Sequence, residues 1–224
     1  MPTTPAALLL LTDGRLPAGG YAHSGGVEAS VQAGRVHDRA SLENFLRGRA
    51  ATSGAVAAAF AAAACSAATA DNIPRLAGLE AELDARMPSP ALRSVSRALG
   101  RQLQRAMRTI RPAPQLDALG RHPHQPIAMG VVAAVFDLDA REAATATLYD
   151  SVAGPAAAAV RLISLDPLEV HAVLADLLAD LDALAATAAG HADTPAPDLP
   201  AHTAPLLDIA AEHHVRQEAR LFAS

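Results

Sequence analysis

The chain has 224 residues, of which 51% are hydrophobic and only 3% aromatic, and its formal net charge is −5. This length allows one sizeable core rather than two domains, and the shortage of aromatic residues disfavours an all-β domain. The negative charge argues against a nucleic-acid binder. We therefore predict an all-α single domain over residues 1–224, a bundle of about eight to ten helices with ordered glycine- and proline-rich loops.

The N-terminal part is expected to contain a flexible segment, 1–7, a short apolar block and then a shaped loop. Five glycines and one proline fall within residues 14–26. Glycine adopts positive φ and proline fixes its own φ, so we predict an ordered loop. The loop concentrates polar residues, namely Asp13, Arg15, Tyr21, His23, Ser24 and Glu28.

A short helix is predicted over 27–36, followed by a long one with Ser41 as its N-cap. No charged residue lies between Arg49 and Asp71, a span long enough to cross a bilayer. The span is mostly alanine, so we predict a buried helix of a soluble protein with no membrane contact, bent near Gly48 and Gly54. The single cysteine, Cys65, excludes an internal disulfide and fits a reducing compartment, which favours a cytoplasmic location.

Helices over 73–86 and 91–111 come next. The second is amphipathic: apolar residues recur every fourth position, and opposite them lies an arginine row, Arg93, Arg97, Arg101 and Arg105. Spacing alone favours a solvated face, with a structural or interface role as the alternative. The loop 121–126 contains His122 and His124, a weak metal-site signal for which an exposed connector is the simpler interpretation.

A helix over 140–162 is expected to kink or restart at Gly154-Pro155. Asp166 is the predicted N-cap of the next helix, with Pro167 at its first position. Its apolar seam, spaced by four and three residues, indicates core packing or a homodimer contact. The seam consists of Val170, Leu174, Leu177, Leu181, Leu184 and Ala188. Residues 191–204 are predicted to be an exposed proline-rich linker and 205–224 a tail.

Several short motifs together resemble those of the UreF family of urease accessory proteins. The N-terminal motif is carried by Leu11, Asp13, Leu16, Pro17, Gly19, Tyr21, His23, Ser24, Gly26, Val27 and Glu28. Further matches are Gly100, Arg101 and Leu103, then His124, Pro126, Ile127 and Gly130, then Val160, Arg161 and Leu162. The C-terminal match is Asp208, His214, Arg220, Leu221, Phe222 and Ser224. The chain lacks the Gly-Gln pair of the family after Leu168, and Val215 replaces an expected glutamate.

The resemblance implies a non-catalytic protein required for inserting nickel into apo-urease. It implies a homodimeric scaffold that bridges the accessory GTPase UreG and a second accessory protein, UreD/UreH. The tail after Pro205 is implied to contact UreD/UreH. No cofactor is expected to bind tightly, although Ni²⁺ passes transiently. The motif residues, including Arg15, would serve partner binding or structure, with no catalytic or metal site among them.

Two alternatives belong to other functional classes. The first is a small helical hydrolase that uses Asp13, His23 and Ser24, although the sequence has no Gly-x-Ser-x-Gly elbow. The second is a nickel-binding or storage protein centred on histidines, namely His23, His122, His124, His213 and His214. The sequence has no Walker A loop, His-Glu-x-x-His motif or dinucleotide fingerprint.

Overall fold

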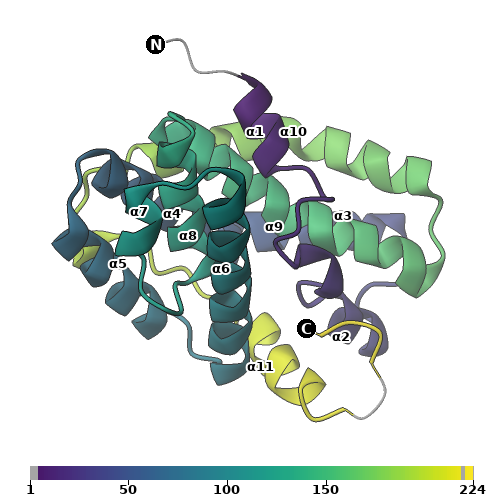
Figure 1. The fold of residues 1–224 in the computed structure, drawn as a ribbon. Helices are drawn as coiled ribbons and strands as arrows, with labels where there is room; N and C mark the ends of the chain where they lie inside the picture. The colour runs from purple at the N-terminus through teal and green to yellow at the C-terminus, as the bar shows by residue number, and fades with distance from the viewer. Residues whose placement is uncertain (1–4, 218–219, 224) are drawn as a thin grey trace.

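The computed structural model describes residues 5–217 and 220–223, and within these ranges the regular elements are all helical (Figure 1). The all-α prediction is therefore confirmed. The α-helices are α1 Pro5–Leu11, α2 Val27–Gln32, α3 Arg39–Arg49, α4 Ala55–Thr69, α5 Ile73–Ala85, α6 Pro90–Ile110, α7 Pro114–Ala118, α8 Gln125–Val135, α9 Ala140–Ile163, α10 Pro167–Ala189 and α11 Pro205–His214. Of the N-terminal segment 1–7 that was predicted to be flexible, residues 5–7 belong to α1, and residues 1–4 lie outside the described residues.

Helix α4, the alanine-rich helix, forms the centre of the core. One side packs into a hydrophobic cluster with α5, α6, α7 and α8, and the other side packs into a second cluster with α2, α3, α9 and α10. Alanine side chains allow neighbouring helices to approach closely, and a Cβ atom on Gly130 of α8 would lie 2.2 Å from the Ala61 carbonyl oxygen. Cys65 is buried here, its thiol donates to the Leu138 carbonyl at 3.4 Å, and burial raises its pKa to about 12.

Helices α3 and α4 are joined by a π-helical turn, Ala50–Gly54, at the predicted bend. Together they form an apolar helix, Arg39–Thr69, long enough to cross a membrane, but 67% of its most apolar window is buried inside the protein. The buried-helix prediction is confirmed. The predicted N-cap was wrong: Asp38 caps α3, its carboxylate accepting from the Ser41 backbone N–H at 2.8 Å.

Helix α9 continues through Pro155 without restarting. Proline has no N–H, so the carbonyl of Ser151, four residues earlier, loses its helical partner. The Arg49 side chain replaces it, with Nε donating to that carbonyl at 2.8 Å. This hydrogen bond joins α3 to α9 and satisfies a polar group that the proline would otherwise leave unpaired.

Helix α10 packs against α9, α4 and α3, with the predicted seam residues buried or partly buried in the second cluster. Core packing within one chain is confirmed, while the homodimer contact stays a prediction. Two aspartates of α10 pair with α3: Asp176 lies 3.2 Å from Arg39, and Asp180 pairs with Arg47.

The segment 191–204, predicted to be an exposed linker, keeps many exposed residues but is also held against α5. Leu199 is buried. The guanidinium of Arg86 donates to the carbonyls of Pro197 and Leu199 at 2.8 and 3.2 Å, and Arg75 binds the carbonyl of Thr194 at 3.2 Å. These arginines satisfy backbone carbonyls that no regular element pairs.

Candidate functional site

The glycine-rich loop before α2 is fixed against two helices. Gly19 has φ of +85°, and a Cβ atom there would lie 1.7 Å from Oε1 of Gln102 on α6. A Cβ on Gly25 would lie 2.7 Å from the ring of Pro155 in α9. Only glycine fits such positions without displacing a neighbour. The predicted ordered loop is thus confirmed, and Gly26 ends it as the residue preceding α2.

At the start of the loop, Asp13 and Arg15 pair with each other. The Arg15 guanidinium donates to the Asp13 carboxylate at 2.9 and 3.0 Å, and this hydrogen bonding lowers the pKa of Asp13. Leu16 packs on the first cluster, whereas Pro17 is exposed. These residues hold the local turn, and exposure limits the energetic worth of the ion pair.

Glu28 of α2 holds the C-terminal segment. Its side chain is almost completely buried, with the residue 2% exposed. Its carboxylate accepts from the backbone N–H groups of Leu221 at 2.8 Å and Phe222 at 3.1 Å. The Ala223 N–H donates to the Ala22 carbonyl at 2.8 Å, so the tail runs along the loop.

His214 and Arg161 complete this contact, which we call the tail junction (Glu28, Arg161, His214 and Phe222). Nε2 of buried His214 lies 3.3 Å from the Phe222 carbonyl and 3.6 Å from the Glu28 carboxylate. Both are acceptors, so Nε2 carries the proton. The Arg161 guanidinium lies 4.4 Å from the centre of the Phe222 ring, a cation–π distance.

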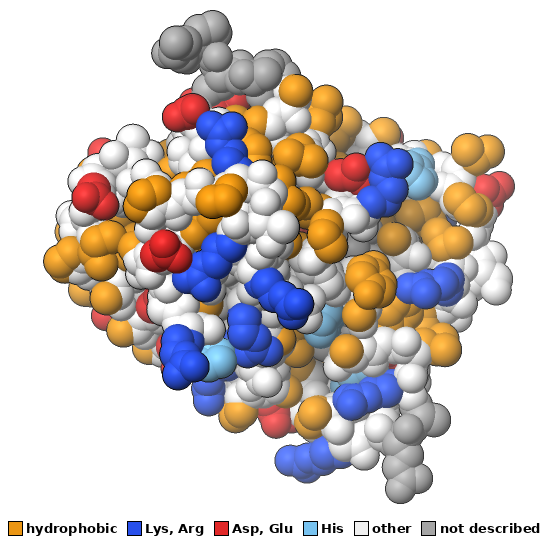
Figure 2. All heavy atoms as spheres, in the orientation of Figure 1, with side chains coloured by type: hydrophobic (Ala, Val, Ile, Leu, Met, Phe, Trp, Pro, Cys, Tyr) orange, Lys and Arg blue, Asp and Glu red, His pale blue; other side chains and the backbone are white. Residues whose placement is uncertain are grey.

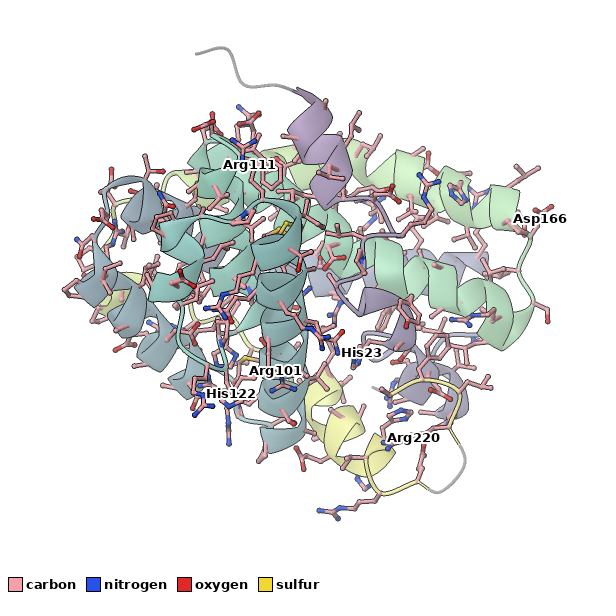
Figure 3. The ribbon with its side chains drawn as sticks, in the orientation of Figure 1. His23, Arg101, Arg111, His122, Asp166 and Arg220 are labelled. Carbon is pink, nitrogen blue, oxygen red and sulfur yellow. The ribbon has the colours of Figure 1, made fainter. Side chains whose placement is uncertain are left out.

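In the tail junction Phe222 packs within its own chain, whereas the predicted docking of the tail on a partner protein stays a prediction. This ring is 5% exposed and packs on the second cluster of its own chain. Leu221 is 74% exposed, and Arg220 is also exposed (Figure 3). Tyr21, in the loop beside the tail, is 75% exposed. The tail therefore contributes its phenylalanine to the core and leaves neighbouring side chains at the surface.

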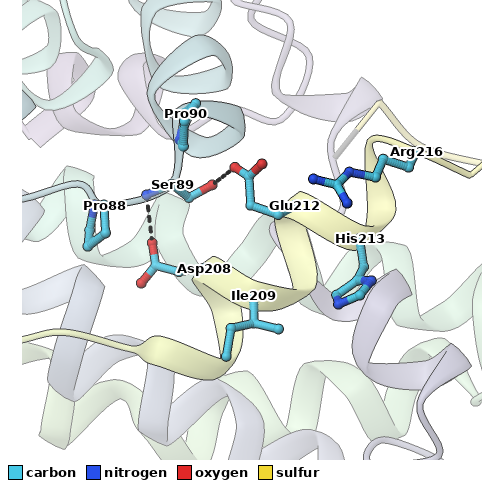
Figure 4. A pocket seen from close by; sticks show the side chains of 8 residues that line it. All are labelled: Pro88, Ser89, Pro90, Asp208, Ile209, Glu212, His213 and Arg216. Carbon is cyan, nitrogen blue, oxygen red and sulfur yellow. Dashed lines mark hydrogen bonds between the residues drawn. The ribbon is translucent and has the colours of Figure 1, made fainter.

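Helix α11 is anchored at the start of α6 by two acidic residues (Figure 4). Asp208 accepts from the Ser89 backbone N–H at 3.3 Å, and Glu212 accepts from the Ser89 hydroxyl at 2.5 Å and from the Ala91 N–H at 2.9 Å. Burial raises the pKa of Asp208, while the Ser89 hydrogen bond lowers that of Glu212. Sequence reasoning missed Glu212, although its spacing of four from Asp208 was a usable signal.

His124 is fully buried and binds α5 and α6. Its backbone N–H donates to Glu80 at 3.0 Å, Nδ1 lies 3.0 Å from the Ser96 hydroxyl, and Nε2 lies 3.0 Å from Asp84. Ser96 also accepts from the Gln125 N–H at 3.2 Å. The Asp84 carboxylate can only accept, so Nε2 carries the ring proton, and Nδ1 of the neutral ring accepts from the Ser96 hydroxyl.

This arrangement makes His124 a structural residue. Burial lowers the pKa of His124, which favours the neutral ring. Both nitrogens are occupied, so the ring has no free position for a metal. The acidic and hydroxyl partners, Glu80, Asp84 and Ser96, were missed because they lie on other helices.

Arg101 stays at the surface, with Nη1 3.0 Å from Nδ1 of His122 (Figure 3). The preceding residue must be glycine for steric reasons, because a Cβ on Gly100 would lie 2.2 Å from the Pro123 carbonyl oxygen. The Gly-Arg motif thus combines a close helix–loop contact with an exposed cation.

Two of the residues proposed for a hydrolase have structural partners. The Asp13 carboxylate binds Arg15, and the buried Ser24 hydroxyl accepts from the Glu28 N–H at 3.4 Å. His23 is half-buried, and burial lowers its pKa. Across residues 5–217 and 220–223, no group of three or more His, Cys, Asp or Glu side chains is arranged to hold a metal ion.

Together, the fold and the tail junction define a class of helical protein whose buried polar side chains have structural roles. Glu28 and His214, for example, hold the loop and the tail in place. Comparison with known proteins agrees. Residues 36–178 match the family model described as UreF. The chain is 44% identical to the urease accessory protein UreF of Mycobacterium marinum over 222 residues, covering 99% of this chain and 100% of the relative.

A second relative of the same description, from Mycobacterium sp. (strain JLS), is 43% identical over 99% of this chain and 100% of its own length. One from Mycobacterium tuberculosis H37Rv is 39% identical, again over 99% and 100%. The chain belongs to the UreF family, whose members are non-catalytic urease accessory proteins of urease maturation and nickel insertion.

Proposed function

We propose that this protein is a cytoplasmic scaffold that bridges the accessory GTPase UreG and a second accessory protein, UreD/UreH, during nickel transfer to apo-urease. Its family membership supports a role in urease maturation. The tail junction is the observation that carries the scaffold proposal. It uses buried polar groups to fix a loop and a tail, which is what a surface prepared for protein partners requires.

Exposed apolar side chains lie on the loop, the tail and α11, the three segments that meet at this junction. Tyr21 and Leu221 are 75% and 74% exposed, and on α11 Leu206 and Ile209 are 63% and 56% exposed. The Ala22–Ala223 hydrogen bond and the contact of Gly26 with Leu207 bring the loop, tail and α11 together. We call Tyr21, Leu206, Ile209 and Leu221 the docking surface. Its aromatic and aliphatic composition is typical of interface centres.

Substitutions on this surface test the proposal more sharply than truncation. Removing residues after Pro205 would also remove His214 and Phe222 and so expose Glu28. The variant Tyr21→Asp/Leu221→Asp leaves the junction intact. Leu168→Asp, at a residue that is 78% exposed on α10, is the control.

We expect the wild type and Leu168→Asp to co-elute with UreD/UreH and UreG in size-exclusion chromatography, and the double variant to lose at least one partner. A double variant that keeps both partners at wild-type affinity would show that the docking surface is assigned wrongly. Multi-angle light scattering on the same samples tests the proposed homodimer.

Nickel is cargo in this proposal rather than a resident cofactor. Weak oxygen and imidazole contacts would let Ni²⁺ pass on. Calorimetric titration of the isolated chain with Ni²⁺ should therefore give weak binding or none. Tight stoichiometric binding that is lost on His→Ala substitution would instead favour a storage protein.

A further inference from the structure

The outer face of α6 carries a concentration of positive charge beside a surface hollow. Arg101, Arg105 and Arg108 follow one another along the helix, and Arg121 reaches the same place from the loop after α7. These four line a hollow of about 510 Å³, which we call the arginine hollow. Figure 2 shows arginine side chains gathered on this face, over α6.

Most of this charge is uncompensated. Of the four arginines only Arg108 has an acidic partner among the described residues, Asp117 at 3.0 Å. Arg101 contacts the His122 ring. Arg105 and Arg121 make no ion pair with any residue of 5–217 or 220–223. Elsewhere Arg39 and Arg47 of α3, Arg75 of α5 and Arg86 just after α5 each pair with a carboxylate. Like charges spaced by three and four residues repel one another on a helix.

The support under the arginine hollow is rigid. Buried Gln104 donates to the carbonyl of Leu116 at 2.8 Å and to that of Leu119 at 3.2 Å, which fixes the α7 wall to α6. The loop that carries Tyr21 contacts α6 at Gln102, next to Arg101. The arginine hollow and the glycine-rich loop therefore both border α6.

We propose that the arginine hollow binds an acidic segment of a protein partner, which presents at least two carboxylates to these guanidinium groups. Arginine matches carboxylates through paired N–H donors. A small anion fits less well, because the lining arginines are exposed and a ligand pocket normally encloses most of its ligand. A nucleic acid is disfavoured by the net charge of −5. The inference rests on the proposed scaffold function.

The test uses the full chain and purified UreG, UreD/UreH and apo-urease as probes. Affinities are measured in low and high salt for Arg101→Glu/Arg105→Glu. The control, Arg35→Glu/Arg141→Glu, makes the same charge change at two exposed arginines. We expect the first variant to lose about tenfold or more in affinity for one partner and most of its salt dependence. The control should match the wild type.

The outcomes separate the two ideas. If the wild type binds none of the three probes, the scaffold function fails. If it binds them and Arg101→Glu/Arg105→Glu binds equally well, the scaffold stands and the arginine hollow is not an interface. Tighter binding of pyrophosphate or a single-stranded RNA than of any protein probe, lost in the variant, would also overturn the inference. Circular dichroism verifies the fold, and Arg101→Lys/Arg105→Lys should bind with intermediate affinity.

Discussion

The carboxylate of Glu28 accepts a hydrogen bond from the backbone N–H of Phe222 at 3.1 Å, across 194 positions of the chain. Both groups are buried, so neither can exchange this contact for water. The glycine-rich loop, α2 and the C-terminal tail therefore form one structural unit, and a change in either end of the chain is expected to affect the other.

Glu28→Gln should loosen the tail. The amide offers one oxygen acceptor and turns an N–H₂ group toward the donors of Leu221 and Phe222, so we expect a loss of about 1–3 kcal/mol in unfolding free energy. Urea denaturation measures it. Trypsin should also cut faster after exposed Arg216 and Arg220. The control Glu43→Gln, on α3, should change both measurements little, because its ion pair with Arg47 is partly exposed. Equal cleavage rates in all three proteins would contradict the role of Glu28.

Gly130→Ala should destabilise the core. The new Cβ would lie 2.2 Å from the Ala61 carbonyl oxygen, so α4 and α8 must separate, at a cost of about 1–3 kcal/mol or more. Gly78→Ala in α5 is the matched control, because no atom lies within 4 Å of its Cβ position. We expect it to stabilise the helix by up to about 1 kcal/mol. Thermal unfolding should give a lower melting temperature than the wild type for Gly130→Ala and an equal or higher one for Gly78→Ala.

Arg49 and Pro155 should be energetically coupled. Arg49→Met removes the donor to the Ser151 carbonyl and should cost about 1–3 kcal/mol, since that carbonyl then has no partner. In a Pro155→Ala background the residue 155 N–H can take over, so Arg49→Met should cost much less there. A double-mutant cycle by denaturant titration gives the coupling energy. Strict additivity would show that the arginine does not replace the missing helical bond.

The stability of the His124 region should depend on pH through Glu80. Burial raises the pKa of this carboxyl from 4.5 to about 7, although the His124 N–H and the Arg97 charge oppose the shift. Between these pH values the Glu80 carboxyl holds a proton in the folded state that it has released in the unfolded chain. The free energy of unfolding therefore falls as pH rises through this range. The lowered pKa of His124 acts in the opposite direction below about pH 6.5.

Glu80→Gln isolates the carboxyl contribution, because the amide does not titrate. Relative to the wild type, the variant should gain stability on the order of 2 kcal/mol between about pH 4.5 and 7. Urea titrations across this range measure the difference. Glu169→Gln, at an exposed position of α10, serves as the control. A constant difference between Glu80→Gln and the wild type would refute the raised pKa.

Local chemistry made several helices predictable. The amphipathic segment 91–111 is α6, Pro90–Ile110, and Asp166 caps α10 by accepting from the Leu168 N–H at 2.8 Å. The N-cap of α3 was wrong because Asp38 and Ser41 both have capping side chains. In the structure they cap together, with Ser41 also accepting from the Asp38 N–H at 3.0 Å.

The candidate site was predictable in its members but not in its contacts. Docking of the tail with Phe222 on a partner was what the family resemblance implied, and nothing in the local sequence indicates that Glu28 and Arg161 contact this residue. The hydrogen bond between Ser89 and Glu212, which are 123 positions apart, is likewise not indicated by the local sequence. Such contacts depend on how whole helices pack, which residue spacing along one helix does not specify.

The burial of Cys65 has a practical consequence for studying assembly. A thiol that is 2% exposed and has a pKa of about 12 forms almost no thiolate at neutral pH. Maleimide dyes should therefore not react with Cys65. A cysteine introduced at the surface can then carry a single fluorophore in an otherwise native chain. Partner exchange can then be followed by energy transfer without first replacing the natural residue.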